Sequence, residues 1–512
     1  MLGKRCEQAE LIAGDWDLVV VGGGITGAGI ALLAARLGKR VLLLEQRDFA
    51  WGTSSRSSKM VHGGLRYLAQ GDLRLTRHSL LEREKLLHDL PELVVRKTYL
   101  FPVRAGEFPG RWGMKAALWL YDFLAGIRDH SWLPLTNLRQ RLPQLRLDGI
   151  KGAMSYTDAL TDDCRLVLRV LHEAVAAGAR LANYTRVDAV EPTATGSRLT
   201  LSDVETGANF VISARLVVNA TGAFADRLSG SDARVRPQRG SHLFFSQERL
   251  PVNDCLTLMH PRDGRPVFLF PWQGVTCVGT TDLDHQVSLD EEASATSVEV
   301  DYLLEVIHAA FPGHQISADD ILSCMAGVRP IIASGKGRDP SKERRDHAIW
   351  QQDGVISVSG GKLTTFRLIA LDVLLAAGLI SKAAHRAGQH DKTPLFQQTL
   401  PFELGNPLKA QPLDAELEAR LTWILDNEMV EHLDDLLLRR TRLGNLLPSG
   451  ALALLPRIQP LCLAQLGWSD NRWQAEVARY LAIVNRHYQP PGRAPIEAPA
   501  AEAAQLDRVC HE

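Results

Sequence analysis

The chain has 512 residues, more than one ordinary domain contains, so two or three hydrophobic cores are expected. Its 45% hydrophobic and 23% charged residues are typical of a soluble globular protein, and 58 basic against 59 acidic residues argue against a nucleic-acid-binding protein. Seven scattered cysteines without a C-x-x-C pair disfavour zinc sites and disulfide frameworks, so we expect no metal site and a reducing, cytoplasmic setting.

The first predicted unit, residues 17–45, is a strand, a glycine turn, a helix and a second strand. Gly22, Gly24 and Gly27 occupy the three positions of the dinucleotide fingerprint: a tight turn, a close approach to pyrophosphate, and close packing of helix on strand. The second strand ends at Glu45, which is placed to bind the ribose hydroxyls and would repel a 2′-phosphate. The unit therefore predicts a dinucleotide site and disfavours NADP.

A basic and aromatic segment occupies residues 104–142 and carries six Lys or Arg against three acidic residues. Its tryptophans and other aromatic residues are interleaved with these charges. Such a composition suits a segment lying in a lipid headgroup layer, or else an ordinary helix buried against a neighbouring domain. No apolar run approaches the ~20 residues of a spanning helix, and the N-terminus lacks the apolar core of a signal peptide, so any membrane contact is expected to be peripheral.

Two later segments repeat the order of strand and small-residue turn. Residues 214–226 run from a buried strand into Thr221 and Gly222, and residues 355–378 run from a strand through two glycines into a helix. We expect a threonine at 364 or 365 to cap that helix and Gly378 to end it. A nicotinamide dehydrogenase usually completes its site within one contiguous domain, whereas three such units spread along the chain suit FAD, which is held at both ends.

Residues 267–282 read as two antiparallel strands around a Gln-Gly turn, which would form a roof over the flavin. Upstream of them, His242 lies in GSHLFF (240–245), beside an apolar strand. An imidazole has a pKa suited to proton transfer near neutrality, so His242 is a candidate general base. The competing interpretation is a hydrogen-bonded histidine of the core.

Several motifs resemble those of the FAD-dependent glycerol-3-phosphate dehydrogenase family. They are TSSRSSKMVHGGLRYLAQGDLRLTRHSLLERE (53–84), GSHLFF (240–245), GTTD (279–282), AGVRP (326–330), SGGKLTTFR (359–367) and DDLLLRRTRLG (434–444). The resemblance covers residues 15–380 and resumes around 420–490. It departs from the family in the segment between about 385 and 434, which is shorter than usual, so the helical cap is expected to be reduced.

The resemblance implies an α/β fold. A Rossmann-like, discontinuous FAD-binding domain would be joined to an antiparallel-sheet substrate domain and a helical C-terminal domain. The expected boundaries are 15–385 for the oxidoreductase part, with FAD-binding parts at about 15–80, 150–235 and 325–385 and the substrate domain at about 81–149 and 236–324, then 400–488 for the helical domain and 489–512 for a disordered tail.

The resemblance also implies site residues. Arg66 and Tyr67 would face the substrate, Arg329 and Lys362 would bind its phosphate and hydroxyl groups, and Thr281 is a weaker candidate for a substrate hydrogen bond. Taken singly, these cations could be surface charges and Tyr67 a packed side chain. We therefore expect the catalytic group to be His242, Arg329 and Lys362.

FAD is expected to bind non-covalently, with a covalent link through His62 as the alternative; otherwise His62 supports the turn that follows it. Lys59 lies in the same polar run as three serines of the cofactor site. The expected cofactor-binding residues are Gly22, Gly24, Gly27, Glu45, Ser55, Ser57, Ser58, Thr221, Gly222, Gly361, Leu363 and Thr364.

The resulting hypothesis is an FAD-dependent glycerol-3-phosphate dehydrogenase. It would pass electrons from sn-glycerol 3-phosphate to a membrane quinone, from the inner face of the membrane, and a homodimer is one assembly it allows. The alternatives are an oxidase that uses O2, an FAD enzyme for another small hydroxy or amino acid, and a flavin-binding interaction protein without turnover. Retention of Arg66, Arg329 and Lys362 argues against the last, because a flavin scaffold needs no phosphate-binding cations.

Overall fold

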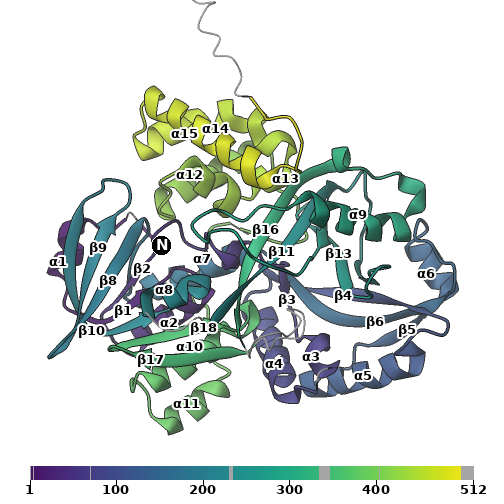
Figure 1. The fold of residues 1–512 in the computed structure, drawn as a ribbon, viewed down its shortest axis with the longest axis horizontal. Coiled ribbons are helices and arrows are strands. Elements are labelled where there is room, and N and C mark those ends of the chain that lie inside the picture. Colours follow the sequence, from purple (N-terminus) through teal and green to yellow (C-terminus); the bar gives the residue numbers. More distant parts are fainter. Residues whose placement is uncertain are drawn as a thin grey trace, which may run out of the picture.

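A computed structural model describes residues 2–3, 5–69, 71–229, 234–333, 346–402 and 404–497; the side chains of Arg66, Ala69 and Ser229 are also outside this description. Two β-sheets lie side by side, the first at the left and the second at the right of Figure 1, and a cluster of helices from the C-terminal part of the chain lies above them. This is the mixed α/β architecture that the sequence predicts.

The first sheet is mainly parallel and has the strand order β17-β18-β10-β1-β2-β7, with β8 and β9 attached as an antiparallel meander to β10. Only β17 of the main path runs antiparallel to its neighbour. The strands are β1 (Trp16–Val21), β2 (Val41–Leu44), β7 (Arg180–Ala182), β8 (Thr185–Thr193), β9 (Gly196–Asp203), β10 (Asn209–Asn219), β17 (His347–Gln352) and β18 (Val355–Gly360).

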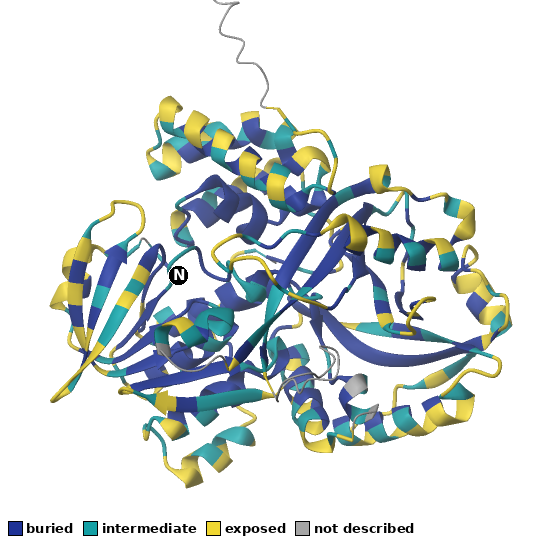
Figure 2. Ribbon diagram, in the orientation of Figure 1, coloured by how far each residue is buried: buried dark blue, intermediate teal, exposed yellow. Residues whose placement is uncertain are grey.

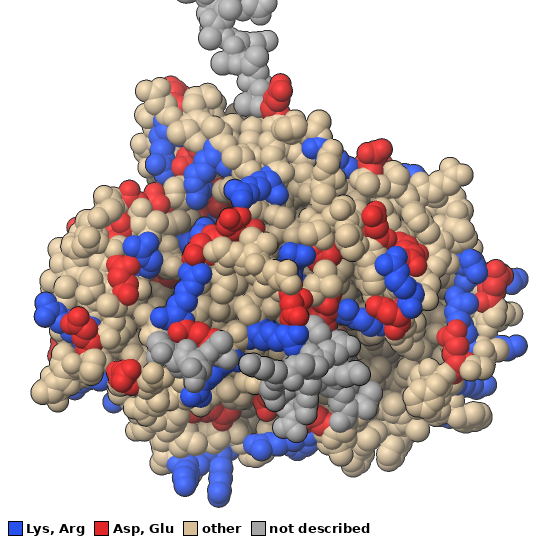
Figure 3. All heavy atoms as spheres, in the orientation of Figure 1, with Lys and Arg blue, Asp and Glu red and all other residues tan. Residues whose placement is uncertain are grey.

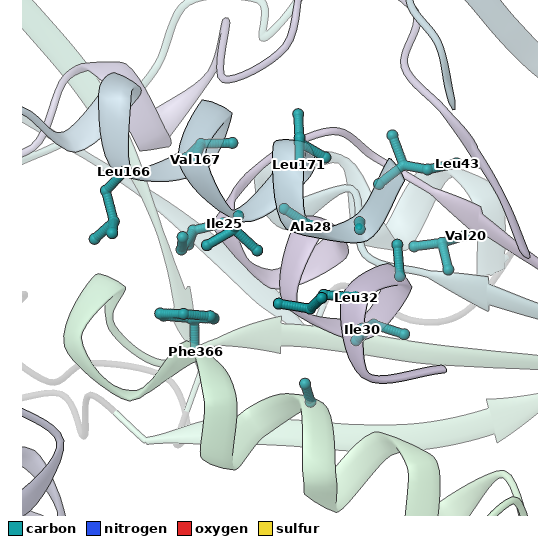
Figure 4. Packing of buried hydrophobic residues seen from close by; sticks show 14 of the residues in the cluster. Val20, Ile25, Ala28, Ile30, Leu32, Leu43, Leu166, Val167, Leu171 and Phe366 are labelled. Carbon is teal, nitrogen blue, oxygen red and sulfur yellow. The ribbon is translucent and has the colours of Figure 1, made fainter. Parts of the chain in front are cut away.

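Both faces of this sheet are buried, as expected for parallel strands rich in Val and Leu. Val20 and Leu43 point to the face covered by helices α2 (Ile25–Arg36), α7 (Asp163–Ala176) and α10 (Phe366–Ala376), and Figure 4 shows Ile25, Leu171 and Phe366 packed there. Val19 and Leu42 point to the opposite face, where they pack with residues of β9 and β10. This packing fixes the carboxyl ends of four parallel strands at one edge.

The second sheet is mainly antiparallel and follows the order β15-β11-β14-β13-β12-β4-β6-β3, with β16 paired to β11 and β5 to β6. Gln273 and Gly274 both have positive φ in the β13–β14 turn, which confirms the predicted hairpin. The strands are β3 (Met60–Val61), β4 (Val94–Arg104), β5 (Ser131–Pro134), β6 (Ile150–Thr161), β11 (Val235–Ser246), β12 (Cys255–Met259), β13 (Pro266–Trp272), β14 (Val275–Gly279), β15 (Leu283–Asp284) and β16 (Ile321–Ile332).

Helices cover the second sheet and form the C-terminal domain. The long central strands of the second sheet are dark blue in Figure 2, because helices pack on both of their faces. The remaining helices are α1 (Gln8–Ala13), α3 (Leu65–Ala69), α4 (Leu73–Asp89), α5 (Gly110–Ala125), α6 (Leu135–Arg141), α8 (Ala225–Ser229), α9 (Ser297–Ala310), α11 (Lys382–Gln389), α12 (Ala415–Asn427), α13 (Leu443–Leu446), α14 (Leu455–Leu466) and α15 (Asp470–Ile483). Within the described residues, no helix combines the length and apolar character needed to cross a membrane.

Strand pairing differs from the expected domain boundaries at three places. β3, β6 and residues 325–332 of β16 fall in the predicted FAD-binding parts, yet all three strands pair within the second sheet. An apolar strand pattern shows that a strand is buried but not which sheet it joins, so these boundaries could not be placed from the sequence. The predicted disordered tail is also wrong for residues 489–497, because Arg493 donates a 2.8 Å hydrogen bond to the carbonyl of Ile321; residues 498–512 lie outside the described residues.

Candidate functional site: a cavity at the carboxyl edge of the parallel sheet

The glycine turn after β1 is shaped by the three predicted glycines. Gly22 has φ +113°, and a Cβ there would lie 2.5 Å from the carbonyl oxygen of Ala220. A Cβ at Gly27 would lie only 1.9 Å from the carbonyl oxygen of Gly22, so α2 could not pack this closely on the turn with any larger residue. Gly24 is the N-cap of α2 and faces the cavity described below. These are the steric requirements of a dinucleotide-binding turn.

Glu45 lies directly after β2 and faces the same turn. Its carboxylate accepts hydrogen bonds from the backbone N–H of Gly23 at 2.7 Å and of Arg47 at 2.9 Å. Burial raises the pKa of this carboxyl, while the two backbone donors oppose the rise. Glu45 is thus held in place by backbone groups at the position where the sequence predicts a ribose ligand.

A cavity of about 1150 Å³ opens at the carboxyl ends of β1, β2, β10 and β18. This is the edge of an open parallel sheet where ligands bind, next to the point at which strand order reverses between β1 and β10. Eight of the predicted cofactor-binding residues line it, and they are Gly22, Gly24, Glu45, Ser57, Thr221, Gly222, Gly361 and Leu363. Gly27, Ser55, Ser58 and Thr364 are not among the described residues of its wall.

The turns after β10 and β18 meet beside this cavity. The hydroxyl of Thr221 donates to the side chain of Asn219 at 2.6 Å, and the carbonyl of Gly222 accepts from the Ser359 hydroxyl at 2.9 Å. Gly361 has φ +76° and has no room for a side chain, because its Cβ would lie 2.5 Å from Ile369. The two turns predicted from distant parts of the sequence therefore line one cavity.

The helix after β18 starts later than predicted. A 3-10 turn covers Leu363–Thr365, and α10 begins at Phe366 without a side-chain cap from Thr365. The Thr364 hydroxyl instead accepts a 3.3 Å hydrogen bond from the backbone N–H of His62. The expected threonine cap is therefore wrong, whereas Gly378, with φ +69°, follows the end of α10 as predicted.

The serine-rich segment 53–58 divides its side chains among several partners. Ser57 donates through its hydroxyl to Asp163 at 2.7 Å, and the buried Ser55 hydroxyl lies 3.4 Å from the carbonyl of Gly52. Ser54 was not among the predicted site residues, yet its hydroxyl accepts the N–H of Ile25 at the N-terminus of α2, at 3.0 Å. In a run of four serines no local pattern distinguishes Ser54 from its neighbours, so only the tertiary structure identifies it.

His242 lies on β11 and is buried. Its Nε2 is 3.0 Å from the hydroxyl of Ser58. Burial, reinforced by the positive charges of Arg329 and Lys59, lowers the pKa of His242 well below its ordinary value. The ring is therefore neutral at neutral pH.

Arg329 lies on β16, and its guanidinium stacks over the backbone of Gly240, where a Cβ would approach within 2.3 Å. It donates to the hydroxyl of Thr280 at 2.9 Å and pairs with Asp282 at 3.3 Å. The hydroxyl of Thr281 is committed elsewhere, since it donates to Glu299 at 2.7 Å and accepts from the N–H of Ser241. Thr281 is buried, and its hydroxyl connects Ser241 of β11 to Glu299 of α9 inside the protein.

Lys362 lines the cavity next to Gly361. Its Nζ lies 3.5 Å from the centre of the Tyr67 ring and donates to the Ser79 hydroxyl at 2.8 Å. Tyr67 is itself buried on α3 and stacks against His62, with ring centres 6.5 Å apart. The structure thus brings together Lys362 and Tyr67, and separately His242 and Arg329, while the side chain of Arg66 lies outside the described residues.

The arrangement defines a dinucleotide-binding protein: a glycine turn and helix at the switch point of a parallel sheet face a cavity of about 1150 Å³. On the second sheet, Val328 and Pro330 line the cavity, whereas Arg329 and His242 are not among the described residues of its wall. Within the described residues, no group of His, Cys, Asp or Glu side chains is arranged to hold a metal ion.

Comparison with known proteins agrees with this class. Residues 17–394 match the family model described as FAD dependent oxidoreductase, and residues 380–473 match that of the C-terminal domain of alpha-glycerophosphate oxidase. The aerobic glycerol-3-phosphate dehydrogenase of Bacillus subtilis (strain 168) is 37% identical over 401 residues, which are 76% of this chain and 71% of that protein. Its counterpart from Staphylococcus aureus (strain MRSA252) is 35% identical over 418 residues, covering 80% and 74%.

Two solved structures share the fold. The glycerol-3-phosphate dehydrogenase from Bacillus halodurans complexed with FAD has a TM-score of 0.75 at 24% identity, covering 97% of this chain and all of that one. The L-alpha-glycerophosphate oxidase from Mycoplasma pneumoniae with FAD bound has a TM-score of 0.57 at 17% identity, covering 70% and 94%. The chain belongs to the FAD-dependent oxidoreductase family, and the predicted cofactor, FAD, is confirmed.

Proposed function

We propose that this protein oxidises sn-glycerol 3-phosphate to dihydroxyacetone phosphate. The observation that carries the proposal is the 37% identity, over three quarters of the chain, to a protein named aerobic glycerol-3-phosphate dehydrogenase. Two cations are consistent with a phosphorylated substrate: Lys362 in the cavity wall, and Arg329 on β16, between Val328 and Pro330 of that wall. We assign both, with Arg66, to the phosphate and hydroxyl groups of the substrate.

The oxidation removes a hydride from C2 and a proton from the C2 hydroxyl, and C2 and its oxygen become a carbonyl. FAD, when bound, accepts the hydride. The proton goes to the chain, and we assign its uptake to Nε2 of His242. This atom belongs to a neutral ring, because burial and nearby cations hold the pKa of His242 well below its ordinary value. The Ser58 hydroxyl, 3.0 Å away, orients the ring.

We assign FAD the cavity at the parallel sheet, bound without a covalent link. Gly22 and Gly24 would admit the pyrophosphate, with the positive end of α2 directed at it, and Glu45 would bind the ribose. The turn at Gly361–Leu363 would contact the flavin end.

For the electron acceptor we propose a membrane quinone, reached from a docking face formed by α5 and the turn before it. Four aromatic side chains on this face are largely exposed: Phe108 (98%), Trp112 (71%), Trp119 (61%) and Phe123 (68%). Arg111 and Lys115 lie among them, with the cations near the ring of Trp112. Exposed aromatic side chains beside basic ones suit a lipid headgroup layer.

The opposite side of α5 is an ordinary packing face. Met114, Leu118, Tyr121 and Ala125 are buried against the second sheet, so the helix is anchored while its outer side faces solvent (Figure 2). Elsewhere, on the face of the molecule drawn in Figure 3, the basic and acidic side chains of the described residues are interspersed. The combination of an anchored helix and an exposed aromatic side supports docking on a membrane rather than burial within the protein.

The substrate proposal is tested by mixing the yellow holoprotein with glycerol 3-phosphate in the absence of air. Bleaching of the flavin absorption by glycerol 3-phosphate, and very little by glycerol, is expected. Bleaching by a hydroxy or amino acid in place of glycerol 3-phosphate would overturn it. Addition of a soluble quinone or of oxygen to the reduced protein then separates the acceptors: rapid reoxidation in air with stoichiometric peroxide would favour an oxidase, as the similarity to an oxidase C-terminal domain allows.

A further inference from the structure

Three arginines in DDLLLRRTRLG are buried although each carries a charge: Arg439, Arg440 and Arg442. They lie in the π-helical turn Asp435–Arg440 of the C-terminal domain and just after it. A buried guanidinium is unfavourable unless it is paired and hydrogen-bonded, so the partners of these side chains show what the segment does.

The first two arginines reach the segment that follows β2 of the parallel sheet. Arg440 donates from its two terminal nitrogens to both oxygens of Asp48, at 2.6 and 2.7 Å. Arg439 donates to the same carboxylate and to Asp434 of its own domain. Asp48 is fully buried and lies three residues after Glu45, at the start of the segment that runs along the cavity.

Arg442 holds the other end of that segment. It donates to the carbonyl of Ser55 at 3.1 Å and to Asp162 at 2.9 Å, and it also pairs with Asp163. Lys59 donates to the same Ser55 carbonyl and to Asp163, each at 2.7 Å. The carboxylate of Asp163 therefore lies between a lysine of the FAD-binding part and an arginine of the C-terminal domain.

A third contact fixes the middle of the segment. The guanidinium of Arg56 is 3.3 Å from the hydroxyl of Tyr488 and pairs with Glu292. Tyr488 belongs to the last helical turn of the C-terminal domain and donates to Glu292 as well. Each buried charged side chain of residues 48–59 is thus tied, directly or through one carboxylate, to the C-terminal domain.

The backbone of these segments is also unusual. Ala50 and Lys59 have φ +60° and +59°, and Arg442 has φ +64°, in the left-handed region that non-glycine residues rarely adopt. Such conformations persist where the surrounding structure imposes them. The same segment supplies much of the cavity wall, through Trp51–Ser54, Arg56 and Ser57, and the C-terminal domain adds His432, Asp434, Arg479 and Arg486.

We infer that the C-terminal helical domain is a structural part of the FAD site: it fixes residues 48–59, and FAD retention depends on its docking. The inference relies on the FAD cofactor and on these contacts, and it does not depend on the identity of the substrate. Because such coupling is reciprocal, bound FAD in turn stabilises the docked C-terminal domain.

The first test compares Arg442→Gln with Arg457→Gln. Arg457 pairs with Glu418 within the C-terminal domain and is partly exposed, so it controls for loss of an arginine in that domain. FAD release from the diluted holoprotein is followed by the rise in flavin fluorescence. Since hydrogen bonds to charged groups are lost, release from Arg442→Gln should be at least about tenfold faster, and release from the control within about twofold of wild type.

A milder variant and a second measurement cover the case in which Arg442→Gln does not fold. Tyr488→Phe removes only the hydroxyl at Arg56 and should speed release about twofold to fivefold. Hydrogen exchange is then compared between wild-type holoprotein and the same protein after FAD release, and the amides of residues 435–446 should exchange more slowly with FAD bound. Wild-type release rates in the folded variants, or equal exchange in the two states, would overturn the inference.

Discussion

The hydroxyl of Ser58 lies 3.0 Å from Nε2 of His242. This contact joins the segment that follows β2 of the parallel sheet to β11 of the antiparallel sheet, so it crosses between the two halves of the molecule. The other ring nitrogen, Nδ1, is buried and has no hydrogen-bond partner among the described residues. In the tautomer with its hydrogen on Nδ1, Nε2 is the acceptor that proton uptake requires.

His242 makes folding stability depend on acid pH. Its pKa in the folded chain lies well below the ordinary 6.5, because burial and the charges of Arg329 and Lys59 disfavour the imidazolium. As the pH falls through about 6.5, the unfolded chain binds a proton that the native chain does not, so acidification destabilises the native state. Urea unfolding of His242→Gln at several pH values should show a weaker loss of stability between about pH 7 and pH 5.5 than the wild type.

The same substitution tests the role in catalysis. If His242 takes the hydroxyl proton, His242→Gln should lower kcat by about 100-fold or more, in the range of general-base contributions. A variant that keeps wild-type turnover would transfer the role to Lys362 or to water. An acid limb caused by His242 should lie below its ordinary pKa of 6.5 and vanish in the variant.

Arg329→Ala should lower kcat/KM for glycerol 3-phosphate by roughly 10- to 150-fold, the equivalent of one or more charge-assisted hydrogen bonds to the substrate. Arg265→Ala is the matched control, because Arg265 pairs with the same carboxylate, Asp282, at 3.0 Å. Steady-state rates with glycerol 3-phosphate measure both. If kcat/KM fell equally in the two variants, the loss would come from the broken ion pair with Asp282 and not from a contact between Arg329 and the substrate.

Gly24→Val should give a protein that purifies with less than about a tenth of the wild-type FAD content. A Cβ at Gly24 already lies 3.1 Å from the Ser54 hydroxyl, and the two further methyl groups would fill the approach to the N-terminus of α2. The ratio of flavin absorption to protein absorption gives the content. Gly313→Val, at a position with nothing within 4 Å of its Cβ, should bind FAD as the wild type does.

Membrane docking through α5 is tested with vesicles that contain anionic lipid. Arg111→Glu, Lys115→Glu and Arg128→Glu together should weaken binding at low salt by at least tenfold, given about 1 kcal/mol per basic residue near the surface. Trp112→Ser with Trp119→Ser should weaken it at both low and high salt, and Val298→Ser, an exposed apolar residue on α9, should not. Sedimentation with vesicles gives the bound fraction. If the charge-reversal variant and the tryptophan variant both bind as the wild type does, α5 is not the docking surface.

Much of the fold is predictable from the sequence, because local patterns encode it. The glycine spacing after β1 and the apolar strands imply the parallel sheet, and the Gln273–Gly274 turn implies the hairpin of the second sheet. The assignment of β6 and β16 to a sheet was not predictable, since strand patterns carry no information about which partner a strand finds.

The site divides in the same way. Glu45 and Gly361 lie in the cavity wall where local motifs place them, but the hydroxyl of Thr281 donates to Glu299, a partner that no local motif indicates. The role of Asp48 was missed because its partners, Arg439 and Arg440, lie about 390 residues further along the chain. Ion pairs across such separations leave no spacing pattern that a sequence could reveal.

The strands around the cavity have a consequence for biosynthesis. Three parts of the chain, residues 16–44, 180–219 and 355–360, pair in the parallel sheet, and Asp48 finds its arginines only at 439 and 440. A nascent chain emerging from the ribosome at roughly 5–20 residues per second would thus expose apolar strands, and carboxylates that are buried in the native protein, long before their partners have been synthesised. Because the cavity wall includes residues up to 487, we expect cofactor capture near the end of translation or after it. The supply of flavin and the protection of the incomplete chain by chaperones would then together limit the yield of active protein.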